Sequence, residues 1–214
     1  MLYHLLYPLH THAALSFLNV VRYVSTRTIL AVLTALLLSL LLGPWFIERL
    51  KARQIGEQIR GDGPTDHKKK AGTPTMGGSL ILFALTIPTL LWCDLHNRFV
   101  WITLGVTVLY GTIGFIDDYL KLTRSKKGLP GRLKLIGQLV VAAAAVGYIF
   151  GSDLYDIGMR YRLALPLVDF YKYPLIVAAP AYFALGIIVL VGSSNAVNLT
   201  DGLDGLAIGP VIIA

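Results

Sequence analysis

Five apolar stretches, each nearly as long as a bilayer is thick, constrain this chain more than any other feature. A helix needs about 20 residues to cross a hydrocarbon core of about 30 Å. The charged share is only 14% and the hydrophobic share 55%, which is too apolar for one soluble core, whereas a bilayer acts as solvent for such helices. We therefore predict an all-α polytopic membrane protein with five transmembrane helices, at residues 29–47, 76–95, 100–120, 133–150 and 173–191.

A sixth apolar stretch begins near Leu206 and continues to the last residue. Its nine residues would cover about 13–14 Å, under half of the bilayer. We therefore expect the start of a sixth transmembrane helix, and a sequence that is a fragment of a longer protein. Residues 1–214 are expected to form a single integral-membrane domain that is truncated at its C-terminus.

The first 24 residues differ from the apolar stretches because polar side chains interrupt them. Apolar residues recur at helical spacing, which predicts a helix that lies in the membrane interface rather than crossing it. Metal ligation is one interpretation of the three histidines in this segment, and interfacial polar residues are the interpretation that we favour. The three are His4, His10 and His12.

Basic residues indicate the orientation of the chain in the membrane. Of the 19 lysines and arginines, seven fall in residues 48–75 and six in residues 121–134. The positive-inside rule places these two loops in the cytosol. The N-terminus, the turn at 96–99 and residues 151–172 are then outside, and residues 192–205 are inside. A net charge of +7 can indicate a nucleic-acid partner, but the basic residues form no continuous face, so we predict none.

Two adjacent carboxylates, Asp117 and Asp118, end an otherwise apolar stretch. Carboxylates near a membrane span are costly, and the end of a helix where its dipole is negative disfavours them further. One interpretation is a site for Mg²⁺, which prefers such oxygen ligands. The alternative is a solvated boundary pair that is held by Lys121 or Arg124.

A second polar group lies in residues 195–205. Asn198, Asp201 and Asp204 are spaced three apart, so that helical turns would place them on one face. Such a face at the mouth of a membrane bundle suits a metal-bound polyphosphate or a polar nucleoside. The alternative is an ordinary loop in which Asp204 caps the next helix. That alternative accounts for only one of the three residues, and we favour a functional role.

Two basic segments are candidate phosphate contacts. Residues 68–78 join three lysines to a turn rich in glycine and proline that leads into a helix, and a helix N-terminus attracts anions. Lys70 and Thr75 are the preferred candidates there, and an ordinary topology signal is the alternative. Lys134 lies at the start of another span. It is either a boundary lysine that snorkels or a contact for a lipid phosphate.

Three segments, in this order, resemble those of the bacterial phospho-N-acetylmuramoyl-pentapeptide transferases, within the polyprenyl-phosphate N-acetylhexosamine-1-phosphate transferase superfamily. The resemblance covers essentially all 214 residues. The first segment favours the muramoyl branch. The segments are 72–78 (GTPTMGG), 114–119 (GFIDDY) and 195–207 (NAVNLTDGLDGLA).

This resemblance implies an enzyme of the bacterial inner membrane with ten transmembrane helices, often a homodimer. Such enzymes require Mg²⁺ and transfer phospho-MurNAc-pentapeptide from UDP-MurNAc-pentapeptide to undecaprenyl phosphate, which gives lipid I and UMP. Asp117 and Asp118 resemble the catalytic pair and are candidate metal ligands. The residues that resemble substrate contacts are Lys70, Thr75, Lys134, Asn198, Asp201 and Asp204.

The family also continues for about four more spans, with a further catalytic aspartate that ligates the metal. The isolated 214-residue piece is therefore expected to be inactive. Three further alternatives remain. One is a related transferase that uses a UDP-N-acetylhexosamine without a peptide. Another is a transporter or channel component, although carboxylates in ion paths usually lie near the middle of the membrane rather than at one face. The third is a non-catalytic fragment that only packs against a partner.

Overall fold

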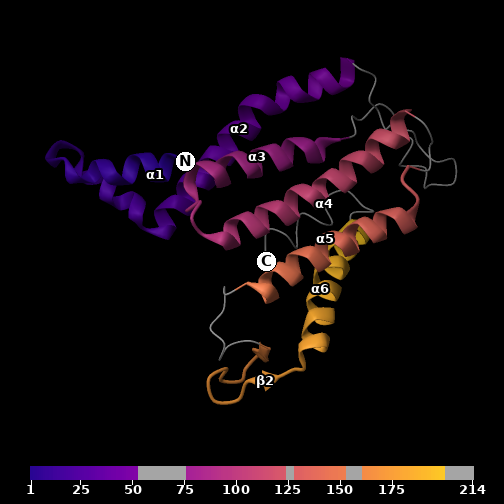
Figure 1. Cartoon of the computed structure of the whole chain (residues 1–214). Coiled ribbons are helices and arrows are strands. Elements are labelled where there is room, and N and C mark those ends of the chain that lie inside the picture. The colour runs from indigo at the N-terminus through magenta and orange to yellow at the C-terminus, as the bar shows by residue number, and fades with distance from the viewer. Residues whose placement is uncertain (53–75, 124–127, 153–160, 201–214) are drawn as a thin grey trace. The chain divides into compact units, whose positions relative to one another are not determined.

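The computed structural model describes residues 1–52, 76–123, 128–152 and 161–200. Helices account for most of this part of the chain (Figure 1). The chain divides into two compact units, Met1–Gly131 and Arg132–Ala214. Each unit is described by itself below.

Three long helices make up most of the first unit. Helix α3 (Gly77–Trp92) packs against both α2 (Val24–Ala52) and α4 (Arg98–Thr123) (Figure 1). A Cβ atom on Gly111 would lie 2.8 Å from Cδ2 of Leu82. The glycine therefore lets α4 approach α3 closely, as small residues do between membrane helices.

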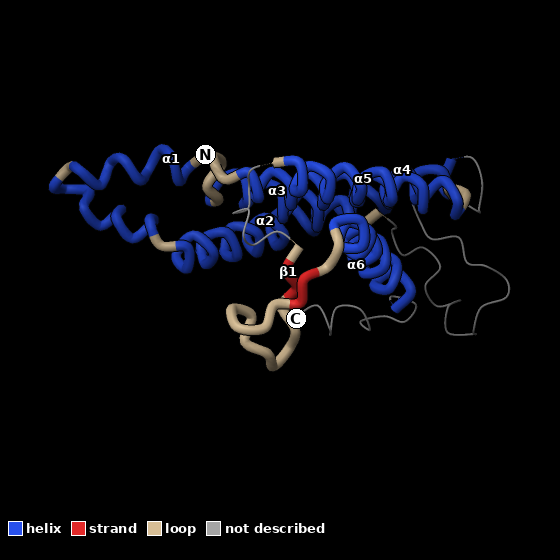
Figure 2. Tube along the Cα trace, turned by 60° about the horizontal axis from the view of Figure 1, so that its bottom comes forward, coloured by secondary structure: helices blue, strands red, loops and turns tan. Residues whose placement is uncertain are grey.

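The described part of the second unit consists of two helices and a short β-ribbon. Helices α5 (Gly131–Gly151) and α6 (Ala179–Thr200) are apolar over most of their length. Between them, β1 (Arg162–Leu163) pairs antiparallel with β2 (Leu175–Ile176), shown in red in Figure 2. The register sets Arg162 opposite Ile176 and Leu163 opposite Leu175.

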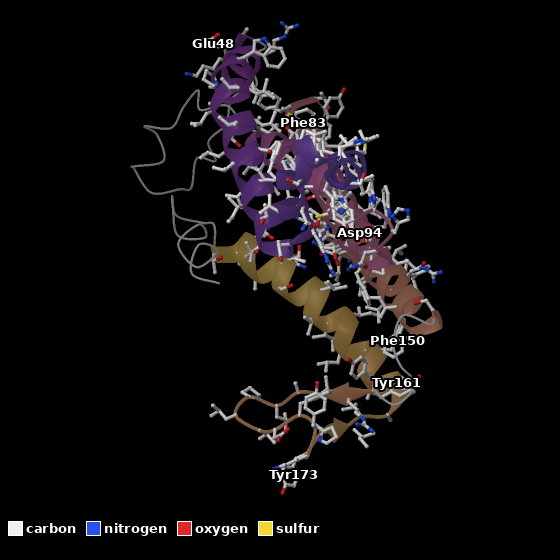
Figure 3. All side chains as sticks on the ribbon, turned by 90° about the vertical axis from the view of Figure 1, so that its left-hand side faces the viewer. Glu48, Phe83, Asp94, Phe150, Tyr161 and Tyr173 are labelled. Carbon is white, nitrogen blue, oxygen red and sulfur yellow. The ribbon has the colours of Figure 1, made fainter. Side chains whose placement is uncertain are left out.

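Aromatic side chains join this ribbon to the helices of the same unit. Phe150 stacks on Tyr161, with ring centroids 5.5 Å apart, and meets Tyr182 edge-on at 5.3 Å. Figure 3 shows Phe150 beside Tyr161, with Tyr173 farther along the same loop region. Such aromatic pairs add about 0.5–1.5 kcal/mol beyond the area that they bury.

The five predicted spans correspond in order to α2, α3, α4, α5 and α6, so the all-α polytopic fold is confirmed. Within the described residues, four of these helices are long and apolar enough to cross a membrane, namely α2, α4, α5 and α6. Helix α3 has 16 residues, which span about 24 Å and fall short of the hydrocarbon thickness. The predicted sixth span lies outside the described residues.

The last predicted span is shifted along the sequence. Residues 173–178 contain strand β2 and its flanking loop, and α6 runs from Ala179 to Thr200. Pro180 therefore lies in the first turn of a helix, where its missing N–H costs nothing. The prediction placed residues 192–200 in a cytosolic segment beyond the span, whereas they continue the helix.

The N-terminal segment is helical but not one continuous helix. It consists of α1 (Leu2–Leu6) and two 3₁₀ helices, η1 (Tyr7–Thr11) and η2 (Ala13–Arg22), with extended backbone at His12 between the last two. The amino group of Met1 donates hydrogen bonds to the carbonyls of Leu90 (2.5 Å) and Leu91 (3.2 Å) at the end of α3. The segment is thus tied to α3, and its position in the membrane interface stays a prediction.

Candidate active site

The carboxylate pair lies near the C-terminal end of α4, which runs to Thr123. The two side chains have different surroundings. The side chain of Asp117 is 12% exposed and that of Asp118 is 39% exposed. Adjacent positions on a helix point in different directions. One carboxylate therefore faces into the unit and its neighbour faces outward.

Lys121, one turn farther along α4, is paired with both carboxylates. Its Nζ lies 2.8 Å from Oδ2 of Asp117 and 3.5 Å from Oδ1 of Asp118. The carboxylate preceding the lysine by four residues is the favourable order for a helical ion pair. The cation also offsets the negative end of the helix dipole. Of the two partners expected for the pair, Lys121 is confirmed, and Arg124 lies outside the described residues.

The segment that precedes α5 closes over Asp117. The backbone N–H of Leu129 donates to Oδ1 of Asp117 at 2.8 Å. Gly128 has a φ of +65°, and a Cβ there would collide with Oδ1 of Asp117 and lie 2.7 Å from Cγ of Lys121. Both the positive φ and the lack of space require glycine. Both carboxylate oxygens of Asp117 are thus engaged.

The two carboxylates are suited to different tasks. Asp117, with a lysine on one oxygen and an amide on the other, is fixed in one orientation. Asp118 is half-exposed, and among the described residues its Oδ2 has no hydrogen-bond partner. Mg²⁺ is usually held by one or two carboxylates together with water and substrate phosphates. Asp118 fits that role better than Asp117 does.

A second polar contact lies inside the C-terminal unit. Nδ2 of Asn195 on α6 donates to Oε1 of Gln138 on α5 at 2.8 Å and to the carbonyl of Val191 at 2.8 Å. Gln138 is only 4% exposed. A buried amide needs such partners, and more so in a span without water. The contact holds α6 one turn before Asn198, which is exposed in the last turn of the helix.

The structure describes only some of the other predicted site residues. Lys134 is half-buried in the first turn of α5. The predicted substrate contacts that lie outside the described residues are Lys70, Thr75, Asp201 and Asp204.

The sequence analysis did not identify Gly128, Leu129 or Gln138 as part of the site. A turn signal was present in Gly128-Leu129-Pro130-Gly131, and a lone glutamine in an apolar span was a second signal. Polar residues within spans usually face the bundle interior.

Known proteins resemble this chain over most or all of its length. The family model described as glycosyl transferase family 4 matches residues 100–214, and signature 1 of phospho-N-acetylmuramoyl-pentapeptide-transferase matches residues 70–82. The first match covers more than half of the chain. The chain belongs to glycosyl transferase family 4.

Curated relatives carry the name phospho-N-acetylmuramoyl-pentapeptide-transferase. One from Sorangium cellulosum is 54% identical over 221 residues, covering 100% of this chain and 58% of the relative. One from Desulfosudis oleivorans is 50% identical, covering 100% of this chain and 57% of the relative. One from Syntrophus aciditrophicus is 48% identical, covering 99% of this chain and 57% of the relative. The resemblance inferred from the three motifs is thus confirmed, and the chain spans a little under three fifths of these relatives' length.

Proposed function

We propose that the protein transfers phospho-MurNAc-pentapeptide from UDP-MurNAc-pentapeptide to undecaprenyl phosphate, giving lipid I and UMP. The observation that carries this proposal is the carboxylate pair at the end of α4, in which a fixed Asp117 stands beside a half-exposed Asp118. The signature at residues 70–82 supports the muramoyl branch over transferases of other sugar nucleotides.

The reaction brings two polyanions together, and its site has to lower their mutual repulsion. Mg²⁺, when bound, would neutralise charge on the diphosphate of the nucleotide. Asp118 is the residue of this chain best placed to hold it, because its carboxylate is half-exposed and only weakly paired. Lys121 places a positive charge beside Asp117 and Asp118, which offsets part of the cost of two carboxylates at the end of an apolar helix.

We also assign Asp118 the role of general base, because its carboxylate is half-exposed and only weakly paired. In this scheme it accepts the remaining proton of the lipid phosphate, and an oxygen of that phosphate then attacks the sugar-bearing phosphorus of the nucleotide. The bond from that phosphorus to the bridging oxygen breaks, and UMP leaves with the oxygen. Asp117 acts as a positioning residue, because its two oxygens already accept hydrogen bonds from Lys121 and Leu129.

The remaining site residues complete the proposal. Lys70, Thr75 and Lys134 would contact phosphates. Asn198, Asp201 and Asp204 would shape the pocket for the uridine diphosphate. The site would face the cytoplasm from the bacterial inner membrane, with the N-terminus outside, as the distribution of basic residues favours. A homodimer stays a prediction.

The test compares Asp118→Asn with Asp117→Asn in the protein reconstituted with undecaprenyl phosphate. Lipid I and UMP are quantified with UDP-MurNAc-pentapeptide and, separately, with UDP-N-acetylglucosamine as the donor. Asp118→Asn should lower the rate at least about a hundredfold, because a general base contributes about 10²–10⁴, without lowering the melting temperature. Asp117→Asn should lower the melting temperature as well as the rate.

Glu48→Gln is the matched control, since Glu48 is an exposed carboxylate near the end of another helix, α2 (Figure 3). It should keep the rate of the unsubstituted protein. Normal kinetics and normal Mg²⁺ dependence in Asp118→Asn would remove this residue from the mechanism. Turnover with the acetylglucosamine nucleotide alone would favour the related transferase instead.

A further inference from the structure

A cluster of two histidines and an aspartate lies at the end of α4 opposite to the carboxylate pair. His4 comes from α1, and Asp94 and His96 come from the turn between α3 and α4. Asp117 follows Arg98 by 19 residues in α4, which corresponds to about 28 Å along the helix axis. The cluster is therefore separate from the proposed transferase site.

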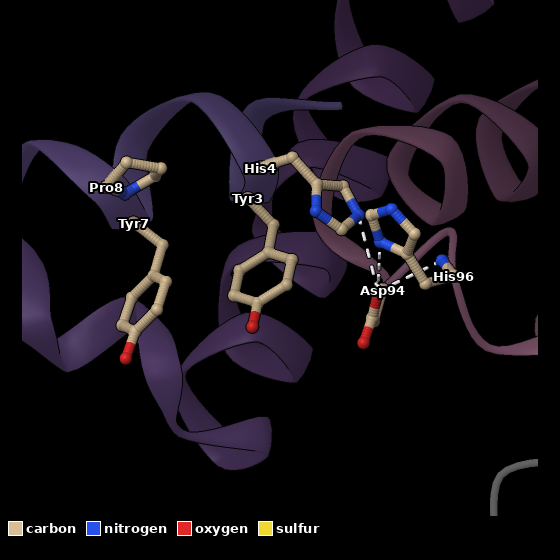
Figure 4. A pocket seen from close by; sticks show the side chains of 6 residues that line it. All are labelled: Tyr3, His4, Tyr7, Pro8, Asp94 and His96. Atoms are coloured by element: carbon tan, nitrogen blue, oxygen red, sulfur yellow. Dashed lines mark hydrogen bonds and ion pairs between the residues drawn. The ribbon is translucent and has the colours of Figure 1, made fainter.

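The three side chains converge on one point (Figure 4). Nε2 of His4 lies 3.3 Å from Oδ1 of Asp94, and Nδ1 of His96 lies 3.4 Å from the same oxygen. The three ligand atoms all lie within 4.8 Å of one another. Two ligands bound tetrahedrally to zinc at 2.0–2.1 Å are about 3.3–3.4 Å apart. Two of the three separations therefore already match such a site.

The hydrogen bonds around the cluster leave its lone pairs facing one another. The backbone N–H of Leu95 donates to Nε2 of His4 at 3.1 Å, which makes this nitrogen an acceptor. That nitrogen nevertheless lies 3.3 Å from a carboxylate oxygen. Two acceptors at this distance need a positive charge between them, either a proton or a metal cation.

The carboxylate of Asp94 is held in place by a backbone hydrogen bond. The backbone N–H of His96 donates to Oδ1 of Asp94 at 3.0 Å, and this bond is the main reason that the pKa of Asp94 is lowered from its usual value. The side chain of His96 is 85% exposed, so its ring can turn to shorten the third separation. Imidazole and carboxylate together are a ligand set that suits zinc.

A small pocket leaves room for a further ligand. It measures about 170 Å³ and is lined by the three cluster residues together with Tyr3, Tyr7 and Pro8 (Figure 4). Structural zinc sites close all four positions, whereas sites with three protein ligands keep one for water. The pocket can supply that water.

We propose that His4, Asp94 and His96 bind one divalent transition-metal ion, with Zn²⁺ as the best fit. The ion would join the N-terminal segment to the turn that begins α4, two parts of the chain about 90 residues apart in sequence. Closing so long a loop stabilises the folded state by restricting the unfolded chain. On the proposed topology, the site faces the outside of the membrane.

The test measures zinc in the purified protein, which carries an affinity tag without histidine. The protein is stripped with EDTA, titrated with ZnCl₂ against a chromophoric chelator, and analysed by elemental mass spectrometry. About one Zn²⁺ per chain is expected, with a rise in melting temperature. Co²⁺ should give the visible absorption of a tetrahedral ion.

His4→Ala and His96→Ala should each weaken zinc binding at least about tenfold and abolish the rise in melting temperature. His96 is exposed on a turn, so its variant should fold normally. His12→Ala is the matched control, because His12 is exposed in the same N-terminal segment and belongs to no such cluster among the described residues. Equal binding by all three variants, or no zinc retained by the unsubstituted protein, would overturn the proposal.

Discussion

The backbone N–H of Leu129 donates to Oδ1 of Asp117 at 2.8 Å, across 12 residues of sequence. The bond fixes a largely buried carboxylate to the segment that leads into α5. Nζ of Lys121 donates a hydrogen bond to the other oxygen, Oδ2. The end of α4 and the start of the following segment are therefore held together by one charged side chain, and changes to any of its partners should disturb both.

Gly128→Ala should destabilise the protein. The residue has a φ of +65°, which costs about 1–2 kcal/mol in an L-residue with a side chain, and its Cβ would overlap Asp117 and Lys121. We expect a loss of about 2–3 kcal/mol once the overlap is relieved by movement of the segment. Thermal unfolding in detergent measures the loss as a lower melting temperature.

Gly131→Ala is the control for that substitution. A Cβ built on Gly131 has no neighbour within 4 Å, and the residue begins α5. Alanine favours a helix over glycine, so this variant should be neutral or slightly stabilising. Equal losses in the two variants would show that the contact with Asp117 is not the cause.

Lys121→Met should leave Asp117 charged without its cation. Removing one partner of a largely buried ion pair costs more than removing a partner at the surface, and the loss here should be about 1–3 kcal/mol. The variant should therefore melt at a lower temperature than the unsubstituted protein. Lys51→Met, which removes an exposed lysine from the last turn of α2, should have little effect.

Adding Asp117→Asn to Lys121→Met separates the ion pair from general helix effects. The neutral amide removes the uncompensated charge, so the double variant should regain part of the lost stability. A double variant whose loss equals the sum of the two single losses would contradict the pairing.

Much of the fold could be predicted from the sequence, because apolar length alone identifies helices that cross a bilayer. The order of the five helices was correct. The start of α6 was not, since residues 173–178 are apolar enough for a span but lie before the helix, with Leu175 and Ile176 paired to Leu163 and Arg162 in the β-ribbon. The break at His12 was also missed, because hydrophobic spacing does not reveal where a chain changes direction.

The sequence predicted which chemical groups belong to the candidate site, but not how they are arranged. Adjacent carboxylates at the end of an apolar stretch identified Asp117 and Asp118. Their unequal roles depend on which one the segment at Gly128 covers, and that contact joins positions 11–12 residues apart. The contact of His4 with Asp94 could not be predicted from the sequence either. The two residues are 90 positions apart and meet only because α1 packs against α3.

Gln138 and Asn195 should be energetically coupled. Their hydrogen bond joins α5 to α6 inside the C-terminal unit. In membrane proteins, such side-chain bonds average about 0.6 kcal/mol and reach about 1.7 kcal/mol. A double-mutant cycle with Gln138→Leu and Asn195→Leu, followed by thermal unfolding, should give a coupling energy in this range.

Ser193 provides the control for the cycle. It is exposed on α6, and its hydroxyl bonds only to the carbonyl of Leu190 among the contacts described. Gln138→Leu and Ser193→Ala should have additive effects. Additivity in the Gln138 and Asn195 cycle as well would mean that the bond contributes nothing measurable to the packing of the two helices.

Single-cysteine labelling should establish the orientation of the chain. The sequence contains one cysteine, Cys93, so Cys93→Ala gives a clean background. Tyr171 is 82% exposed in the segment expected outside, and Lys51 is exposed at the end of α2 that is expected inside. In spheroplasts, a membrane-impermeant maleimide should label Tyr171→Cys at once and Lys51→Cys only after lysis.

The positive-inside rule underlies this expectation, because basic loops near spans remain in the cytosol. Asp118 lies at the end of α4 that the same rule places inside. The opposite labelling pattern would put that carboxylate on the outer face, where cytoplasmic nucleotides do not reach it. The orientation experiment therefore tests the proposed transferase site as well as the topology, and it does so independently of any measurement of activity.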